Sequence, residues 1–174
     1  MRSRRRVLAA CSVFLPVLCL SAWLLLSPAH TWLELTDERT GRKILSRPLA
    51  DGEQVVLTWT NSLFRLPVTE VFVAGSGVLT LTEITFADPT GSGPPHVKPA
   101  DVDDLYHTGG PFKAEGLSRP VSRVVFRVGE IGHPALKVGN RVVHFAEEVG
   151  FGGAVLLTAR PATVRERIVG WASR

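Results

Sequence analysis

The sequence predicts an all-β fold, an antiparallel β-sandwich or barrel of about eight or nine short strands. Apolar and polar residues alternate with a period of two along most of the chain after residue 30, as they do in half-buried strands. Clusters of Gly, Pro, Asp and Asn interrupt this alternation at short intervals, as expected for tight turns. Helical periodicity is nearly absent before residue 163. A sheet-forming domain is therefore the expected core of this protein.

The predicted strands follow one another from residue 32 onward. They cover residues 32–36, 43–47, 54–60, 68–73, 78–86, 121–128, 135–138, 141–145 and 153–159. Along 78–86, one face is expected to carry Leu79, Leu81 and Glu83, and the other Val78, Thr80, Thr82, Ile84 and Phe86. Hairpins are expected at Gly75-Ser76-Gly77 and at Gly139-Asn140, because glycine and asparagine tolerate positive φ. Residues 88–117 are rich in Pro, Gly and Asp without periodicity, which predicts a long loop.

The N-terminal residues predict a segment that enters a membrane. Arginines at 2 and 4–6 precede residues 7–26, which contain no charge. Twenty helical residues reach about 30 Å, the thickness of the hydrocarbon core of a bilayer, and a basic flank stays on the cytoplasmic side. This length favours an uncleaved single-pass anchor, whereas Ser27-Pro28-Ala29 is typical of a signal-peptidase site and leaves secretion as the alternative. The chain after His30 is expected outside the cytoplasm.

These observations divide the chain into three parts. They are a signal or anchor segment (1–30), an extracytoplasmic β domain (31–161) and a short amphipathic C-terminal tail (162–174). In the tail, Thr163 is a candidate N-cap for a short helix whose Val164, Ile168 and Trp171 lie on one face. This tail either packs on the β domain or contacts a membrane or a partner.

Composition excludes several classes of function. Four of the 20 Lys and Arg residues lie in the N-terminal segment, so the exported part is formally neutral against its 16 Asp and Glu residues. A neutral domain does not favour nucleic-acid binding, which needs a basic face. Both cysteines, Cys11 and Cys19, lie inside the apolar segment, so no disulfide framework is expected. The five histidines are scattered without a metal-binding spacing, and neither a metal site nor a cofactor is predicted.

The most unusual stretch runs from Trp59 to Glu70. A strand ends in Asn61 and Ser62, crosses a short loop that carries Arg65, and continues into a strand that carries Glu70. If the two strands pair, these four side chains converge at one end of a sheet. Two interpretations remain open. The asparagine and serine brace the loop beside an ordinary Arg–Glu salt bridge, or the four residues form a polar site in which the arginine binds a carboxylate.

Three blocks of motifs carry a resemblance to a known family. They are Trp59, Ser62, Pro67, Val68 and Glu70; then Gly91, Gly93 and Pro94; then His133-Pro134-Ala135-Leu136 and Gly150-Phe151-Gly152-Gly153. In their order and spacing they resemble the small exported bacterial proteins catalogued as domain of unknown function 1850. The resemblance covers roughly residues 32–160. Where that family usually has a histidine, this chain has Asn61, whose amide does not titrate and cannot act as a general base.

The resemblance implies an accessory role in solute import. Proteins of that family tend to be encoded beside, or fused to, the membrane subunit of TAXI-type TRAP transporters. The first hypothesis is therefore a membrane-tethered, non-enzymatic accessory protein that acts by contact with a membrane transporter subunit. The second is a module that binds a small carboxylate solute through Asn61, Ser62 and Arg65, beneath residues 88–117. The third is an exported hydrolase that uses Ser62 with Glu70 and either His133 or His144.

Overall fold

A computed structural model describes residues 31–163, 165 and 166. The predicted membrane segment at 7–26, the signal-peptidase motif at 27–29 and the apolar stripe of the tail lie outside these residues. Within the described part of the chain, none of the helices has the length and apolar character that a membrane crossing requires.

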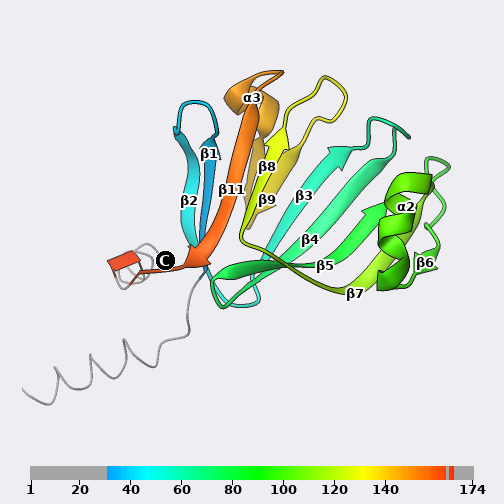
Figure 1. The fold of residues 1–174 in the computed structure, drawn as a ribbon, viewed down its shortest axis with the longest axis horizontal. Coiled ribbons are helices and arrows are strands. Elements are labelled where there is room, and N and C mark those ends of the chain that lie inside the picture. The colour runs from blue at the N-terminus through cyan, green and yellow to red at the C-terminus, as the bar shows by residue number, and fades with distance from the viewer. Residues whose placement is uncertain (1–30, 164, 167–174) are drawn as a thin grey trace, which may run out of the picture.

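The described residues fold into two β-sheets that pack against each other (Figure 1). Sheet A has four strands, in the order β2 (Lys43–Leu49), β1 (Thr31–Asp37), β11 (Ala154–Pro161) and β8 (Arg123–Arg127). Sheet B has seven, in the order β10 (Arg141–His144), β9 (Ala135–Val138), β3 (Gln54–Thr60), β4 (Pro67–Gly75), β5 (Val78–Phe86), β7 (Phe112–Val121) and β6 (His96–Val97). The all-β prediction is confirmed as a sandwich-like fold, with eleven strands among the described residues in place of eight or nine.

The prediction of a purely antiparallel arrangement is wrong at one edge of sheet B. Strand β6 pairs with β7 in parallel, with His96 opposite Lys113. The chain between them runs through a short 3₁₀ helix, η1 (Pro99–Asp101), and the helix α2 (Val102–Thr108). Two parallel strands need such a crossover connection, whereas a tight hairpin can join only antiparallel strands.

The predicted long loop at 88–117 therefore contains structure that the sequence pattern did not reveal. It holds β6, η1, α2 and the first half of β7. Val102, Leu105 and Tyr106 of α2 pack on the hydrophobic core at helical spacing, but the helix has only seven residues and two exposed aspartates interrupt the pattern. A pattern this short falls below the window in which helical periodicity is recognisable.

A β-bulge overturns the predicted faces of β5. Val71 of β4 lies opposite Glu83 and the next residue lies opposite Leu81, so Thr82 is the extra residue of the bulge. Its hydroxyl donates a hydrogen bond to the carbonyl oxygen of Val71 at 3.1 Å. After the bulge the alternation changes phase, and the buried face carries Leu79, Leu81, Ile84 and Phe86.

Two other predicted strands have different bounds. Residues 121–128 do not form one strand, because the chain leaves sheet B after Val121 and enters sheet A at Arg123 as β8. Phe145, expected at the end of a strand, instead begins the short helix α3 (Phe145–Val149). Both predicted hairpins are confirmed, since Gly75 pairs with Val78 and Val138 pairs with Arg141.

The two sheets differ in width, and α2 covers the part of sheet B that sheet A leaves open (Figure 1). At one side, the guanidinium of Arg141 on β10 donates to the carbonyl oxygen of Ile44 on β2 at 3.3 Å. At the other side, Tyr106 of α2 packs against Phe86 of β5 and Phe112 of β7, with ring centroids 5.3 Å and 6.5 Å away. The core thus continues from between the sheets to beneath this helix.

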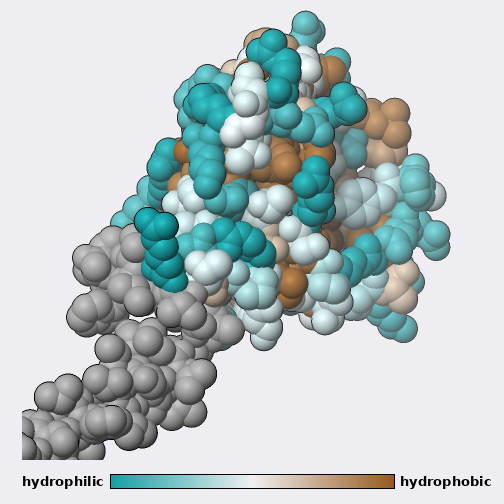
Figure 2. All heavy atoms as spheres, turned by 60° about the vertical axis from the view of Figure 1, so that its left-hand side comes forward, coloured by the Kyte–Doolittle hydropathy of each residue, from teal (hydrophilic) through white to brown (hydrophobic). Residues whose placement is uncertain are grey.

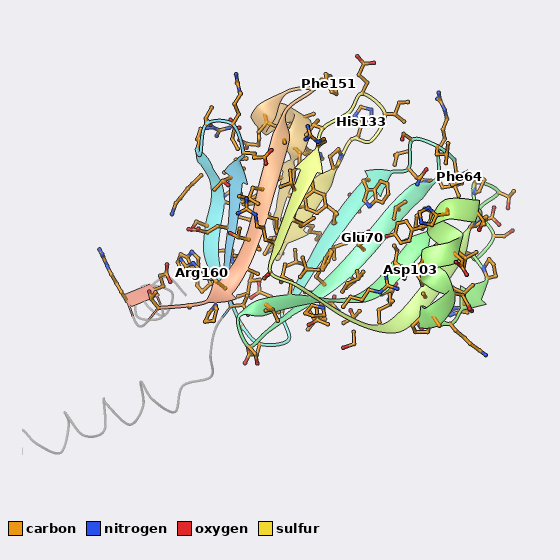
Figure 3. The ribbon with its side chains drawn as sticks, viewed as in Figure 1. Phe64, Glu70, Asp103, His133, Phe151 and Arg160 are labelled. Atoms are coloured by element: carbon orange, nitrogen blue, oxygen red, sulfur yellow. The ribbon has the colours of Figure 1, made fainter. Side chains whose placement is uncertain are left out.

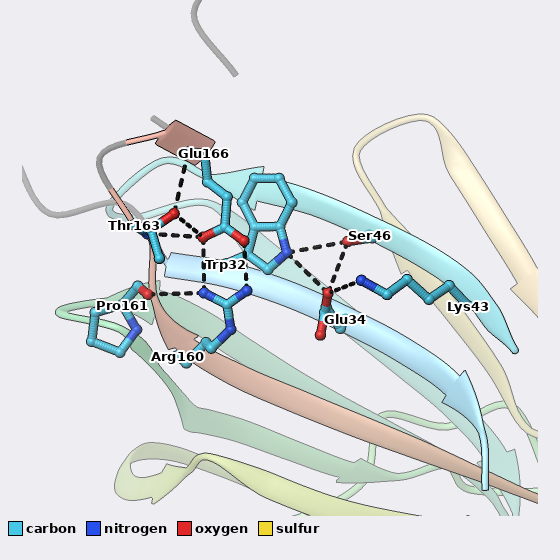
Figure 4. A network of polar contacts seen from close by, with 8 residues as sticks. All are labelled: Trp32, Glu34, Lys43, Ser46, Arg160, Pro161, Thr163 and Glu166. Atoms are coloured by element: carbon cyan, nitrogen blue, oxygen red, sulfur yellow. Dashed lines mark hydrogen bonds and ion pairs between the residues drawn. The ribbon is translucent and has the colours of Figure 1, made fainter. Parts of the chain in front are cut away.

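The outer face of sheet A carries a polar network. Figure 2 turns this side forward and shows hydrophilic residues over much of it, with apolar residues visible between them. On this face, the indole of Trp32 donates to Ser46 at 3.1 Å, and Glu34 accepts from Lys43 at 2.8 Å (Figure 4). The Arg160 guanidinium lies 6.0 Å from the centre of the Trp32 ring.

The same arginine contacts the residues that follow β11. Its two terminal nitrogens donate to the two carboxylate oxygens of Glu166, at 2.8 Å and 2.6 Å (Figure 4). Glu166 also accepts from the Thr163 N–H at 2.8 Å, and the Thr163 hydroxyl accepts from the Glu166 N–H at 3.3 Å. This reciprocal pair has the contacts of a capping box, as the prediction of Thr163 as an N-cap requires, and the predicted apolar stripe lies outside the described residues.

These contacts predict an acid-sensitive contribution of Glu166 to stability. They lower its pKa from 4.5 to about 2, through the Arg160 hydrogen bonds first and Thr163 next. A lowered pKa gives stability that is present above the unfolded value and lost as the pH falls toward the folded one. We therefore expect Glu166→Gln to lower the melting temperature at neutral pH, and the gap from wild type to close between about pH 4.5 and 2.

The matched control is Asp51→Asn, which removes a charge from an exposed turn. Its melting temperature should track that of the wild type over the same range. A gap between Glu166→Gln and wild type that does not change with pH would contradict this account.

Candidate functional site

A cleft opens beside β8, over strands β3 and β4 of sheet B. It has a volume of about 230 Å³, and its lining consists of Trp59, Glu70, Val125, Phe126, Arg127, Gly132 and Pro134. In Figure 3, Glu70 lies on β4 in the interval between β8 and α2. Strands β3 and β4 supply the floor of this cleft, and β8 with the loop that follows it supplies one wall.

Glu70 is the one carboxyl group among the residues that line the cleft. Alternation along β4 directs Val68, Glu70 and Phe72 to the same face, and the two apolar neighbours are buried in the core. Directly across the ladder, Glu70 lies between Leu57 of β3 and Ile84 of β5, both of which are fully buried. The strand register thus places a glutamate in an otherwise apolar row.

The surroundings of Glu70 favour its protonated form. Burial raises the pKa of Glu70, and hydrogen bonds from Tyr106 and Trp59 offset this effect only in part. The Tyr106 hydroxyl donates to Oε1 of Glu70 at 2.8 Å. Burial, and then the neighbouring Glu70, also raise the pKa of Tyr106. This pair joins α2 to the centre of sheet B.

An aromatic cluster fixes the position of Tyr106. Phe86 and Phe112 stack with centroids 4.6 Å apart, and Trp59 meets Phe86 edge to face at 6.2 Å. The C-terminal end of α2 is held from above by Phe64 of the β3–β4 loop (Figure 3). Phe64 lies so close to Gly109 that a β-carbon at this position would overlap its ring, and φ there is +78°. Only glycine fits this contact.

The loop after β8 is fastened to the end of β3. The Thr60 N–H donates to the carbonyl oxygen of Gly132 at 2.7 Å. Next to it, His133 adopts a φ of +42°, and its ring meets Phe151 edge to face at 6.3 Å (Figure 3). The β3–β4, β8–β9 and α3–β11 loops therefore adjoin at one end of the sandwich, the end opposite Thr31.

Arg127 lies where the cleft meets its neighbouring hollows. An adjacent hollow of about 500 Å³ shares Trp59, Arg127 and Gly132 with the cleft and adds Ser62 and Ile131. A third hollow, of about 660 Å³, continues from Arg127 toward Phe151. The side chain is exposed, and among the described residues it has no ion-pair partner.

The predicted convergence of four polar side chains occurs only in part. Strands β3 and β4 do pair, with Thr60 opposite Pro67. Asn61 braces the loop, since its Oδ1 accepts from two backbone N–H groups, those of Leu63 at 2.9 Å and Phe64 at 3.0 Å. Of the two interpretations of this stretch, the structure supports loop bracing for the asparagine.

The expected Arg65–Glu70 salt bridge does not form. Arg65 is exposed in the loop, where φ is +56°, whereas Glu70 points inward beneath Tyr106. Arg65 and Glu70 belong to the same hairpin, but the alternation along β4 directs the Glu70 side chain into the sandwich and away from the loop.

The other predicted site residues are spread over the same end of the fold. Ser62 is exposed and lines the 500 Å³ hollow, but within the described chain no hydrogen bond joins it to a histidine or to Glu70. Pro67 begins β4. Gly91 and Gly93 lie in the exposed loop between β5 and β6, in a turn where Asp88 accepts from the Thr90 N–H at 2.8 Å, and neither lines the cleft.

Sequence reasoning missed three residues of this site. Arg127 and Phe126 lie in a run that reads as an ordinary strand, and Tyr106 lies in the region predicted as a loop. One signal for Tyr106 was present in the sequence. It is the single tyrosine of the chain, and it lies in Val102–Thr108, where the apolar residues have helical spacing. No local pattern links β8 to β4, because the two strands belong to different sheets.

The chain matches no family model, no curated protein and no solved structure. The resemblance carried by its sequence motifs therefore stays an expectation. What the cleft can bind follows from its lining, which combines a carboxyl group, a guanidinium group and two aromatic rings.

The raised pKa of Glu70 predicts a stability that falls as the pH rises. The folded protein holds this proton more tightly than the unfolded chain, so stability is lost from about pH 4.5 upward, through the folded pKa. Glu70→Gln keeps the shape and removes the titration. We expect this variant to gain melting temperature relative to the wild type as the pH rises across that window.

Glu115→Gln serves as the control with the opposite sign. Its partner Lys113 lowers the pKa of Glu115, so this variant should lose relative stability as the pH rises. Parallel pH profiles for Glu70→Gln and the wild type would show that the Glu70 carboxyl is not buried as described.

Proposed function

We propose that this protein is a membrane-tethered, extracytoplasmic accessory protein of a TAXI-type TRAP solute-uptake transporter, and that its β domain binds a small carboxylate solute. The predicted N-terminal anchor supports the location, and the motif resemblance supports the association with transport. The observation that carries the binding role is the cleft beside β8, where Arg127 has no ion-pair partner among the described residues.

The chemistry of the cleft suits a small solute. Its apolar walls, formed by Val125, Phe126 and Pro134, exclude water from one side of a ligand. A guanidinium group at the rim offers two parallel N–H donors to a carboxylate. A volume of about 230 Å³ suits a metabolite rather than a peptide. The donor is Arg127, on β8, in place of the Arg65 that the sequence pattern favours.

A binding role agrees with the geometry better than hydrolysis does. Ser62 is exposed on the β3–β4 loop, and the described residues give it no histidine or glutamate to activate its hydroxyl. His133, one of the two histidines proposed to activate it, packs against Phe151. A serine nucleophile needs a general base within hydrogen-bond reach.

A test of the binding role uses the full-length protein in detergent and a panel of small carboxylates. We expect at least one of them to raise the melting temperature of the wild type. Arg127→Gln should abolish this stabilisation, because the amide cannot donate the charged, paired hydrogen bonds. The matched variant Arg65→Gln should retain it. Absence of stabilisation by every panel member, or equal loss in both variants, would refute the binding role.

The transporter contact has an observation of its own. Three apolar side chains are exposed at the cleft end of the sandwich, Leu63 (74 %), Phe151 (61 %) and Ile131 (39 %). Their loops adjoin, through the Thr60–Gly132 hydrogen bond and the contact between His133 and Phe151. Exposed apolar residues grouped at one end are typical of protein contact sites. We place the contact with the transporter at these loops.

Co-purification tests this placement. A tagged full-length protein should recover the permease subunit under mild detergent, and the double variant Leu63→Ser, Phe151→Ser should recover at least several-fold less. Val142→Ser is the control, since Val142 is 48 % exposed on β10, away from these loops. Recovery of no transporter component by the wild type would exclude the accessory role, and equal recovery by all variants would exclude this surface.

A further inference from the structure

The cleft holds two groups of opposite charge that do not pair with each other. Glu70 lies at its floor and Arg127 at its rim, and no ion pair joins them within the described chain. Tyr106 and Trp59 supply hydrogen bonds to Glu70, but neither carries a positive charge. An ionised Glu70 therefore lacks a counter-charge at the bottom of the cleft.

The walls beside Glu70 suit a cation. Trp59 lines the cleft next to Glu70, and Phe126 lines it from β8. An organic ammonium group gains from the negative face of an aromatic ring as well as from a carboxylate, and both gains grow where water is excluded. Val125 and Pro134 add apolar surface that fits alkyl groups around a nitrogen.

A solute with a carboxylate alone does not satisfy this cleft. When such a solute binds Arg127, the rest of the molecule extends toward Glu70. A neutral or negative group there leaves the charge of an ionised Glu70 without a counter-charge. A positive group at that end removes the mismatch. A carboxyl group and a guanidinium group line one cleft of about 230 Å³, a volume that suits a molecule of metabolite size carrying both charges.

We propose that the ligand of the cleft is a small zwitterion, with its cationic nitrogen against Glu70 and Trp59 and its carboxylate against Arg127. This inference rests on the proposed function and narrows it to a substrate class. Glu70 then acts as the selectivity group, and Arg127 as the group that all carboxylates use.

Two probes of the same shape separate these roles. Glycine betaine has a trimethylammonium group and a carboxylate, and 3,3-dimethylbutanoate has a carbon in place of the nitrogen. Titration calorimetry of the full-length protein should show betaine binding at least about ten-fold more tightly, as expected for a cation beside an aromatic ring and a carboxylate. In Glu70→Gln the preference for betaine should shrink to what the aromatic ring alone supplies, because the amide carries no charge.

The outcomes distinguish the two proposals. Equal binding of both probes to the wild type, lost in Arg127→Gln, overturns the zwitterion and leaves the carboxylate site intact. Binding of neither probe, or binding that Arg127→Gln leaves unchanged, overturns the carboxylate site itself. The comparison of probes on the wild type needs no variant, so the test survives even if Glu70→Gln is poorly folded.

A pH series adds an independent readout. Tyr106 on α2 and Trp59 on β3 hydrogen-bond to Glu70, Arg127 on β8 lines the same cleft, and the Arg119–Asp103 ion pair lies near the tyrosine. A cationic ligand prefers ionised Glu70, so binding releases its proton to solvent. Betaine affinity for the wild type should therefore fall as the pH is lowered through the raised pKa of Glu70, and this fall should be absent in Glu70→Gln. Equal pH profiles of betaine affinity for the two proteins would contradict the assigned role of Glu70.

Discussion

The structure depends on how a seven-stranded sheet is covered by a four-stranded one. Sheet A does not cover the ends of β5 and β7 that carry Phe86 and Phe112, both fully buried. Helix α2 covers them, and its position is fixed by the ring contacts of Tyr106 and by the hydrogen bond of Tyr106 to Glu70. The cover consists of two separate pieces, and the cleft opens beside one of them, β8, over Trp59 and Glu70 of sheet B.

Placing a carboxyl group on the floor of this cleft has an energetic cost. Glu70 occupies a position between Leu57 and Ile84 that an apolar side chain would fill with more stability. Transfer of a polar group from water costs roughly 1–3 kcal/mol unless its hydrogen bonds are replaced, and here Tyr106 and Trp59 replace only some of them. A group kept at such a cost beside an open hollow is a candidate for ligand recognition.

Much of the fold could be predicted from short-range patterns. The β4–β5 and β9–β10 hairpins follow from alternation and turn residues, because both signals are local. The phase of β5 after Thr82 could not be predicted, because a bulge is one extra residue that the alternation does not reveal in advance. Helix α2 was not predicted, because its stability comes from packing on the aromatic rings beneath it rather than from its own seven residues.

The sequence by itself determined the class of the fold, the hairpin turns, the capping role of Thr163 and the unusual character of the stretch around Glu70. Those properties depend on residues near one another in the chain. Only the tertiary structure decided that Glu70 faces inward to Tyr106 rather than outward to Arg65, and that Arg127 is the arginine of the cleft. The physical reason is that these neighbours come from β4, α2 and β8, so their meeting depends on how two sheets and a helix pack.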